Sequence, residues 1–211
     1  MAISRDDVLN WISASALVIS ENRDYLIHLN SVNGDADHGA NMDRGFQAVI
    51  AKMPEISKQD IGTILKTVGM TLKLTIGGAA GQLYGTFFLQ AGKKVPGKLE
   101  LYLDDWCTVL EAATDGVMIR GNSEPGDKTM VDTLFPAVNA LKQAAKDNLP
   151  LRQALIRSTE AAKMGMEHTT QLVARKGRAR YLGERSAGHQ DPGATSMFLI
   201  LKAAADTWAG C

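Results

Sequence analysis

The chain has few cysteines, no long apolar run and no excess of charge of either sign, and each shortage argues against a class of protein. Two cysteines, Cys107 and Cys211, occur among 211 residues, without the spacing of a metal site. One of them is terminal, so a structural disulfide is not expected, and a reducing compartment fits this usage. The 23 basic and 23 acidic residues cancel, which argues against direct nucleic-acid binding through bulk charge.

Membrane contact is not expected either. The N-terminal stretch MAISRDDVLNW has no apolar signal core, and no window approaches the roughly 18 apolar residues of a membrane span. Linkers, repeats at a fixed period and low-complexity tracts are also missing. Apolar residues make up 45% of the chain, enough to bury one full core. We therefore expect a single cytoplasmic domain over residues 1–211.

Strand signals are weak, and the apolar pattern favours helices. Alternating apolar runs and Asn-Gly hairpin turns are absent, whereas apolar residues recur at spacings of three and four from Val8–Ile19 through to Met197–Trp208. Ser4 is the expected N-cap of the first helix, and Ser57 is a candidate cap for the helix over Ile61–Leu72. About eight helices in one domain predict an all-α bundle or closed helical barrel.

One loop carries paired carboxylates. Residues 34–45 read GDADHGANMDRG, with Asp35 and Asp37 two residues apart, then His38, then an expected helix start. Mg²⁺ prefers oxygen ligands on flexible backbone, and a helix N-terminus offers free N–H groups to phosphate. The loop therefore suggests a site for a Mg-nucleotide. A lone Asp-x-Asp is nevertheless more often a solvated acidic turn.

Three further loops are rich in glycine and precede expected helices. Residues 75–85 read TIGGAAGQLYG, residues 116–129 read GVMIRGNSEPGDKT, and residues 175–196 read RKGRARYLGERSAGHQDPGATS. Each loop alone is explained by helix termination. Together they indicate several helix N-termini gathered at one end of a bundle, where phosphate binds well. The last loop is either a solvated basic loop or a phosphate-facing lid.

Known nucleotide-binding fingerprints are missing. The chain has no Walker A sequence, no strand-led dinucleotide fingerprint and no protein-kinase glycine loop. A nucleotide site in this protein must therefore be built on helices.

Seven motifs, in order, resemble one known family. The chain resembles the nucleotide-binding L subunit of bacterial dihydroxyacetone kinase, the form driven by the phosphoenolpyruvate-dependent phosphotransferase system. The resemblance runs from Trp11 to the last helix. Its motifs are GDADHGANMDRGF (34–46), GMTL (69–72), IGGAAG (76–81), YGTFF (84–88), DGV (115–117), EPGDKTM (124–130) and ARKGRARYLGERSAGHQDPGATS (174–196).

The resemblance implies a fold and a division of labour. The fold is a single-domain antiparallel barrel of eight helices with the nucleotide site at one end. ADP stays tightly bound, and a phosphohistidine-bearing M subunit of the phosphotransferase system recharges it to ATP. The phosphoryl group then passes to dihydroxyacetone on a separate K subunit. The implied cofactors are ADP/ATP and two Mg²⁺ ions, and the implied activity is that of a kinase subunit that is not active alone.

The same resemblance implies roles for individual residues. Asp35 and Asp37 correspond to two metal ligands. Asn30 stands where relatives carry the third, an aspartate, and its amide oxygen can ligate Mg²⁺ but carries no charge. No catalytic base is expected in this chain, because the acceptor hydroxyl is activated on the partner. The implied nucleotide contacts are His38, Gly39, Ala40, Asn41, Ala79, Ala80 (Ser in many relatives), Gly121, Met130, Arg178, Asp191, Pro192 and Gly193.

Two alternatives stay open beside this interpretation. Asn30 leaves room for a regulatory nucleotide-binding module that acts through contact with a transcriptional regulator, or for a kinase subunit serving another short ketose. A free-standing kinase with its own sugar site is less favoured, because the additional domain that single-chain relatives use is not found in the sequence.

Overall fold

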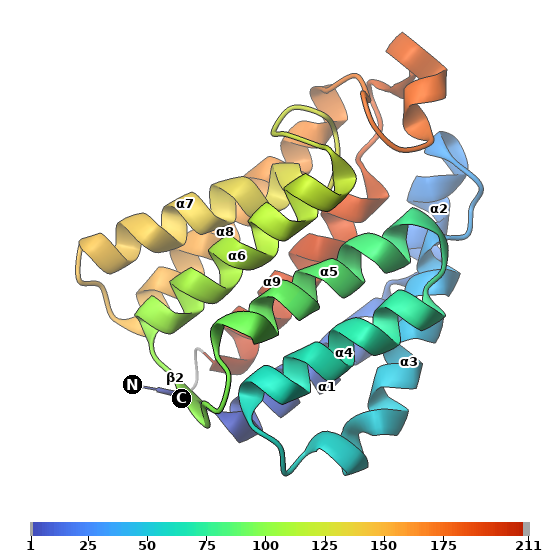
Figure 1. Ribbon diagram of the computed structural model, residues 1–211. Coiled ribbons are helices and arrows are strands. Elements are labelled where there is room, and N and C mark those ends of the chain that lie inside the picture. Colours follow the sequence, from blue (N-terminus) through green and yellow to red (C-terminus); the bar gives the residue numbers. More distant parts are fainter. Residues whose placement is uncertain (1, 209–211) are drawn as a thin grey trace.

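The protein is helical almost throughout (Figure 1). The computed structural model describes residues 2–208, and Cys211 lies outside this range. Two short 3₁₀ helices, η1 (Thr169–Gln171) and η2 (Ala179–Ser186), lie between the last two α-helices. The α-helices are α1 (Arg5–Glu21), α2 (Arg23–Asn33), α3 (His38–Ile56), α4 (Ile61–Thr75), α5 (Gly78–Lys94), α6 (Leu103–Gly121), α7 (Val131–Lys146), α8 (Leu151–His168) and α9 (Pro192–Trp208).

Eight of these helices form a closed ring. Helix α1 contacts α3, each helix from α3 to α8 contacts its successor, and α9 returns to α1. Helix α2 lies against α3 and α9 at one end of the ring (Figure 1). The predicted all-α barrel is thus confirmed, with α2 as a ninth helix outside the ring.

A cluster of three tryptophans joins both ends of the chain to its middle. The ring centroids of Trp11, Trp106 and Trp208 lie 4.9–5.5 Å apart, in edge-to-face arrangements that aromatic rings prefer. The indole N–H of Trp11 donates to the Ile200 carbonyl at 2.9 Å, and that of Trp208 donates to the Asp7 carbonyl at 3.0 Å. These contacts connect α1, α6 and α9, so the first and last helices close the ring.

The helix starts follow their capping residues, with one correction. Ser4 and Asp7 form the capping box of α1, as predicted for Ser4. Ser57 does not cap α4; it ends α3 instead, and Asp60 caps α4 by accepting from the backbone nitrogen of Thr63 at 3.1 Å. The prediction for Ser57 was wrong because a cap must stand directly before the first helical residue to reach the N–H groups two or three positions on.

Glycines allow α4 and α5 to approach closely. A Cβ added at Gly69 would lie 2.7 Å from the Gly85 carbonyl oxygen, and one added at Gly92 would lie 2.5 Å from the Gly62 carbonyl oxygen. Side chains at these positions would force the two backbones apart. The two helices therefore pack backbone against backbone.

Strand structure is limited, in the described residues, to one short ladder at the end of the barrel where α1 begins and α9 ends. Strand β1 (Ile3–Ser4) pairs antiparallel with β2 (Glu100–Leu101), and Ile3 and Leu101 are buried opposite each other. Two-residue strands leave no alternating pattern, so this ladder was not predicted. Within residues 2–208, no helix is long and apolar enough to cross a bilayer.

Candidate functional site

A cavity of about 530 Å³ opens at one end of the barrel. Because neighbouring helices alternate in direction, α3, α5, α7 and α9 all begin at this end, and their first residues or caps line the cavity. The four loops selected from the sequence supply these helix starts. The positive ends of four helix dipoles therefore face one space.

Most of the predicted site residues come together here. Gly39 and Ala40 do not line the cavity. Gly39 faces α2, where an added Cβ would lie 2.1 Å from the Arg23 carbonyl oxygen, so its lack of a side chain serves helix packing. The predicted residues that line the cavity are Asn30, Asp35, Asp37, His38, Asn41, Ala79, Ala80, Gly121, Met130, Arg178, Asp191, Pro192 and Gly193.

Further lining residues were not predicted individually. All of them fall inside the three glycine-rich loops, so the loops marked the right regions, but loop composition does not reveal which side chains turn inward. They are Gly77, Gly78, Gln82, Leu83, Tyr84, Val117, Arg120, Ser123, Lys128, Thr129, Lys176, Gly177 and Ala179.

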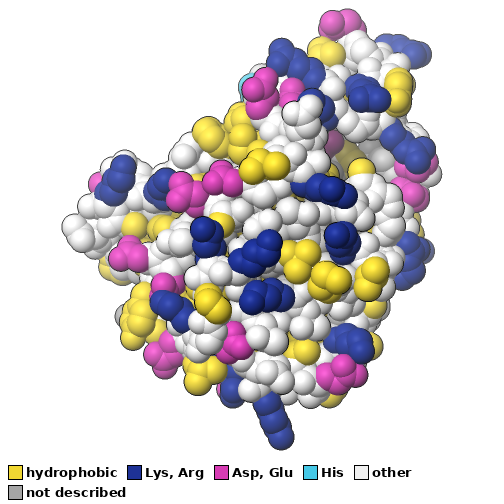
Figure 2. Space-filling model, viewed as in Figure 1, with side chains coloured by type: hydrophobic (Ala, Val, Ile, Leu, Met, Phe, Trp, Pro, Cys, Tyr) yellow, Lys and Arg dark blue, Asp and Glu magenta, His cyan; other side chains and the backbone are white. Residues whose placement is uncertain are grey.

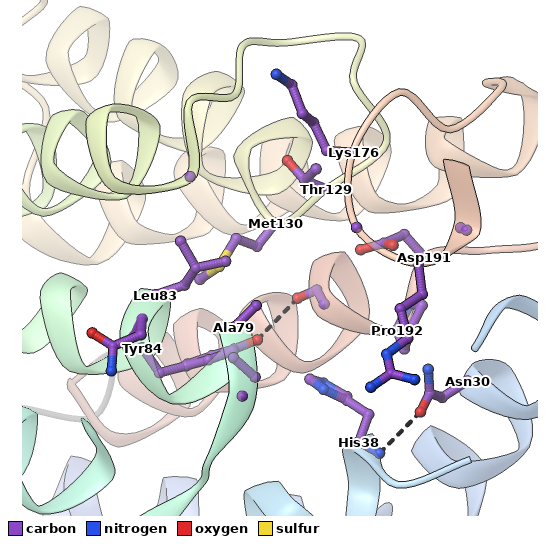
Figure 3. A pocket seen from close by; sticks show the side chains of 18 of the residues that line it. Asn30, His38, Ala79, Leu83, Tyr84, Thr129, Met130, Lys176, Asp191 and Pro192 are labelled. Atoms are coloured by element: carbon purple, nitrogen blue, oxygen red, sulfur yellow. Dashed lines mark hydrogen bonds between the residues drawn. The ribbon is translucent and has the colours of Figure 1, made fainter. Parts of the chain in front are cut away.

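The cavity has an apolar side and a polar side. Leu83 and Met130 lie together on one side in Figure 3, near Val117 in the cavity lining. His38 and Asn30 lie on the other side. An apolar slot beside a polar, helix-capped region suits a ligand with a flat ring at one end and anionic groups at the other.

The backbone that opens α5 is shaped for close approach of a ligand. Gly77 and Gly78 both have positive φ, at 79° and 55°, and no described heavy atom lies within 4 Å of a Cβ built on Gly78. Arg44 braces this turn by donating to the carbonyls of Thr75 and Ile76, each at 3.0 Å. The turn therefore has no side chains on the side of the cavity, and Arg44 fixes its backbone from the other side.

Asn30 connects the acidic loop to the end of α2. The Asn30 amide oxygen accepts from the backbone nitrogens of Asp37 at 2.9 Å and His38 at 3.0 Å, and so caps α3. Between the two exposed carboxylates, Ala36 has a φ of 58°, a conformation that costs energy for any residue with a side chain. An amide oxygen has two lone pairs, and both of these face N–H groups of α3.

The donor set fits Mg²⁺ only with help from a ligand. Among residues 2–208, no group of three or more His, Cys, Asp or Glu side chains is placed to hold a metal. Asp35 and Asp37 alone offer two carboxylates. Mg²⁺ is commonly held by one or two carboxylates together with phosphate oxygens and water. The residues present therefore suit a metal that arrives with a phosphorylated ligand.

His38 is part of a buried hydrogen-bond network under the cavity floor. Its Nε2 lies 2.8 Å from Ser196 Oγ, which lies 2.6 Å from the Tyr84 hydroxyl. The Tyr84 hydroxyl also donates to the Gly193 carbonyl at 3.1 Å. Burial lowers the pKa of His38 to about 4, so the imidazole is uncharged at neutral pH. It thus contributes hydrogen bonding at the start of α3 and no charge.

Asp191 begins α9 with an unusual carboxyl. Its Oδ2 accepts from the Ala194 nitrogen at 2.7 Å. The pKa of Asp191 is raised to about 7, chiefly by desolvation and also by the neighbouring Asp132, while the Ala194 N–H and Lys128 act in the opposite direction. Near neutral pH this carboxyl therefore takes up or loses a proton easily.

Residues 169–191 form a closing segment that leads from α8 to α9 beside the cavity. Its Arg178 forms an ion pair with Asp35, with 3.0 Å between Nη2 and Oδ2. The Arg178 side chain is 70% exposed, and both partners of the ion pair line the cavity. The closing segment thereby meets the acidic loop and brings a guanidinium to the polar side.

Comparisons with known proteins agree on one family. The model for the DAK2 domain matches residues 32–206. The chain is 45% identical over 202 residues to the ADP-binding subunit DhaL of the PEP-dependent dihydroxyacetone kinase of Escherichia coli (strain K12), covering 96% of both chains. It is 40% identical over 186 residues to the ADP-binding subunit DhaL of PEP-dependent dihydroxyacetone kinase 2 of Listeria innocua, covering 87% of this chain and 86% of that one.

A solved structure shares the fold. The dihydroxyacetone kinase from C. freundii in complex with AMP-PNP and Mg²⁺ is similar with a TM-score of 0.69 and 26% identity, over 94% of this chain and 33% of that one. The chain thus spans about a third of that kinase.

Proposed function

The chain belongs to the DAK2 domain family, and on that premise we propose that it is the ADP/ATP-binding subunit of a dihydroxyacetone kinase. It binds the nucleotide in the cavity at the end of the barrel and presents the γ-phosphate to a ketose held on a separate K subunit. The observation that carries the proposal is the convergence of four helix N-termini, two loop carboxylates and an apolar slot on one cavity.

The two sides of the cavity suit the two ends of an adenine nucleotide. Leu83, Val117 and Met130 suit the faces of the base, because an apolar slot buries a flat ring without unpaired polar groups. The starts of α3 and α5 suit the phosphates, because their N–H groups and dipoles stabilise negative charge. Arg178 adds a positive charge at the same end.

Asp35 and Asp37 would hold Mg²⁺ together with phosphate oxygens. Bound there, the metal neutralises charge that develops on the transferred phosphoryl group. The chain itself then positions the nucleotide: α3 orients the phosphates, and the uncharged His38 keeps the helix start fixed through Ser196. Removal of the proton from the acceptor hydroxyl falls to the partner that holds the ketose.

Three protein roles follow from this division. The present chain carries the phosphoryl donor, the K subunit carries dihydroxyacetone or a related short ketose, and a phosphohistidine-bearing M subunit rephosphorylates the bound ADP. Names of the relatives support the scheme, since they are described as ADP-binding subunits of PEP-dependent kinases.

Two measurements test this function. Denaturing mass spectrometry of the purified protein should release ADP, and elemental analysis should find Mg²⁺ with it. Phosphorylation of dihydroxyacetone should require addition of a matching K subunit, and multiple turnovers with phosphoenolpyruvate should further require the phosphotransferase donor chain. Robust phosphorylation of the free ketone by this chain with ATP alone would contradict the division of labour.

A further inference from the structure

Lys128 has an environment that is unusual for lysine. Its exposed fraction is 1%, although lysine is rarely buried without a partner. Its ammonium ion has three N–H groups to donate, and four backbone carbonyls surround it. Every N–H group therefore has an acceptor, and one of them is shared between two carbonyls. The distances from Nζ to these oxygens are 2.5 Å (His189), 2.7 Å (Ser186), 2.8 Å (Thr169) and 3.1 Å (Leu172).

All four carbonyls belong to the closing segment. Two lie near its start and two near its end, so the ammonium ion joins both ends at one point. Only Lys128 of this cage comes from outside the segment, from the loop between α6 and α7. The adjacent Asp127 adds a backbone link, because its carbonyl accepts from the Arg175 nitrogen at 3.1 Å.

The closing segment has little apolar core of its own. Its buried apolar residues are Ala174 and Ala179, and its buried polar residues are Thr169 and Ser186. Hydrogen bonds hold the segment in place instead. Ser186 Oγ accepts from the Ala174 nitrogen at 2.8 Å, and Thr169 Oγ1 accepts from the Asp191 nitrogen at 3.0 Å. Two buried alanines bury too little area to order a segment of this length. The ammonium cage is therefore the strongest single fixing point.

The backbone at Lys128 supports a specific role. Its φ is 62°, in the left-handed region that side chains disfavour. Such conformations persist where the surroundings determine them. Asp132 braces the same loop by accepting from the nitrogens of Gly126 at 2.6 Å and Thr129 at 2.7 Å. The backbone that carries Lys128 is thus fixed, and its side chain extends into the closing segment.

The same segment carries two residues of the proposed site. Arg178 reaches Asp35, and Asp191 opens α9. We propose that Lys128 is a positioning residue whose ammonium ion acts as an internal cation, holding residues 169–191 closed over the cavity and thereby slowing release of the bound adenine nucleotide. The second half of this statement rests on the proposed function, whereas the first half stands without it.

The first experiment uses no nucleotide. Lys128→Met removes the donors at similar volume, Lys128→Gly empties the cage and also relieves the backbone strain, and exposed Lys146→Met at the far end of α7 is the matched control. Trypsin has several sites in the segment, at Arg175, Lys176, Arg178, Arg180 and Arg185. Both Lys128 variants should be cut there about tenfold faster or more, because hydrogen bonds from a charged donor are lost, and the control should match the parent chain.

Chemical rescue separates a missing cation from general damage. Ammonium or methylammonium chloride should slow the cleavage of Lys128→Gly toward the parent rate, because the small cation can occupy the four-carbonyl cage. The same salt should not rescue Lys128→Met, whose side chain fills the space. Tetramethylammonium chloride at equal ionic strength has no N–H group and should rescue neither variant.

Release of a fluorescent ADP analogue completes the test. The analogue should leave Lys128→Met about tenfold faster than it leaves the parent, with Lys146→Met unchanged. Failure of the parent chain to bind the analogue would instead contradict the proposed function and leave the protease result to decide the positioning role. Parent-like cleavage of both Lys128 variants, or faster cleavage with unaltered release, would overturn the proposal.

A measurement on the parent chain guards against variants that fail to fold. Amides of the closing segment, including those of Ala174 and Gly188, should exchange hydrogen about as slowly as amides of α8, because the cage holds both ends of the segment. Exchange at the rate of an open loop would show that the four carbonyls are not held, and would overturn the proposal without any substitution.

Discussion

The side-chain oxygen of Asn30 lies 3.0 Å from the backbone nitrogen of His38, and this bond joins the end of α2 to the start of α3. The same oxygen accepts from the Asp37 nitrogen. An aspartate here could cap α3 with one oxygen and keep the other for a cation, whereas the asparagine has its single oxygen engaged. The position that the resemblance assigns to a third metal ligand therefore serves the helix in this chain.

Replacing Asn30 tests whether the position belongs to the metal shell. Asn30→Asp should keep the cap, add a charge beside Asp35 and Asp37, and tighten ADP binding at saturating Mg²⁺ several-fold. Asn30→Ala should lose the cap and lower the free energy of unfolding by about 1 kcal/mol. Calorimetric ADP titration and thermal unfolding measure the two effects. Unaltered affinity and unaltered coupled kinase activity in Asn30→Asp would place the residue outside the metal shell.

The loop carboxylates should matter for the ligand and not for the fold. Asp35→Asn and Asp37→Asn should each weaken binding of Mg-ADP about tenfold or more, since each removes a negatively charged oxygen ligand, while the helical circular dichroism spectrum stays unchanged. Asp24→Asn is the matched control, because its side chain is 92% exposed on α2. If both loop variants bind Mg²⁺ and ADP like the parent chain, the loop is only a solvated turn.

Arg178 should act on ligand binding with little effect on stability. Its ion pair with Asp35 is exposed, and such pairs contribute about 0–1 kcal/mol. Arg178→Gln should therefore leave the melting temperature almost unchanged but weaken ADP binding, and the loss should shrink as salt concentration rises. Arg152→Gln on α8, which does not line the cavity, is the control. An equal salt-dependent loss in both variants would argue against a specific phosphate contact.

Asp191 should make stability fall as pH rises. Its pKa is about 7 in the folded chain against an ordinary 3.8, so between these values the native state holds a proton that the unfolded chain has released. The free energy of unfolding then falls with pH, by up to about 1.4 kcal/mol per unit from this group. The groups around it include the Asp132 carboxylate, the Lys128 ammonium, the Tyr84 hydroxyl and the N–H groups of Gly193 and Ala194.

Removing this carboxyl gives a clean comparison. Asp191→Asn can still cap α9 but does not titrate, so its stability relative to the parent chain should grow between about pH 4 and about pH 7. Urea unfolding without nucleotide or Mg²⁺ measures the difference at each pH, and Asp206→Asn on the exposed face of α9 is the control. A stability difference that does not change with pH would show that Asp191 has an ordinary pKa.

The surface of the barrel explains why charge did not reveal the site. Basic and acidic side chains are interspersed over the face shown in Figure 2, in keeping with 23 residues of each kind. The information lay in the loops, where glycines, carboxylates and arginines recur before helix starts. Glycine permits backbone conformations that other residues disfavour, so a run of glycines marks a loop in the sequence. The direction of each side chain depends on contacts made after folding and cannot be read in the same way.

The sequence by itself determined the helices, the Ser4 cap and the loops that carry the site, because helix periodicity and capping depend on residues three or four positions apart. Tertiary structure decided which loop residues face the cavity, that Asn30 caps α3, and that Lys128 is buried in a carbonyl cage. The lysine bonds to carbonyls 41 to 61 residues away. Such partners meet only after the helices close their ring, so no pattern of neighbouring residues in the sequence predicts these bonds.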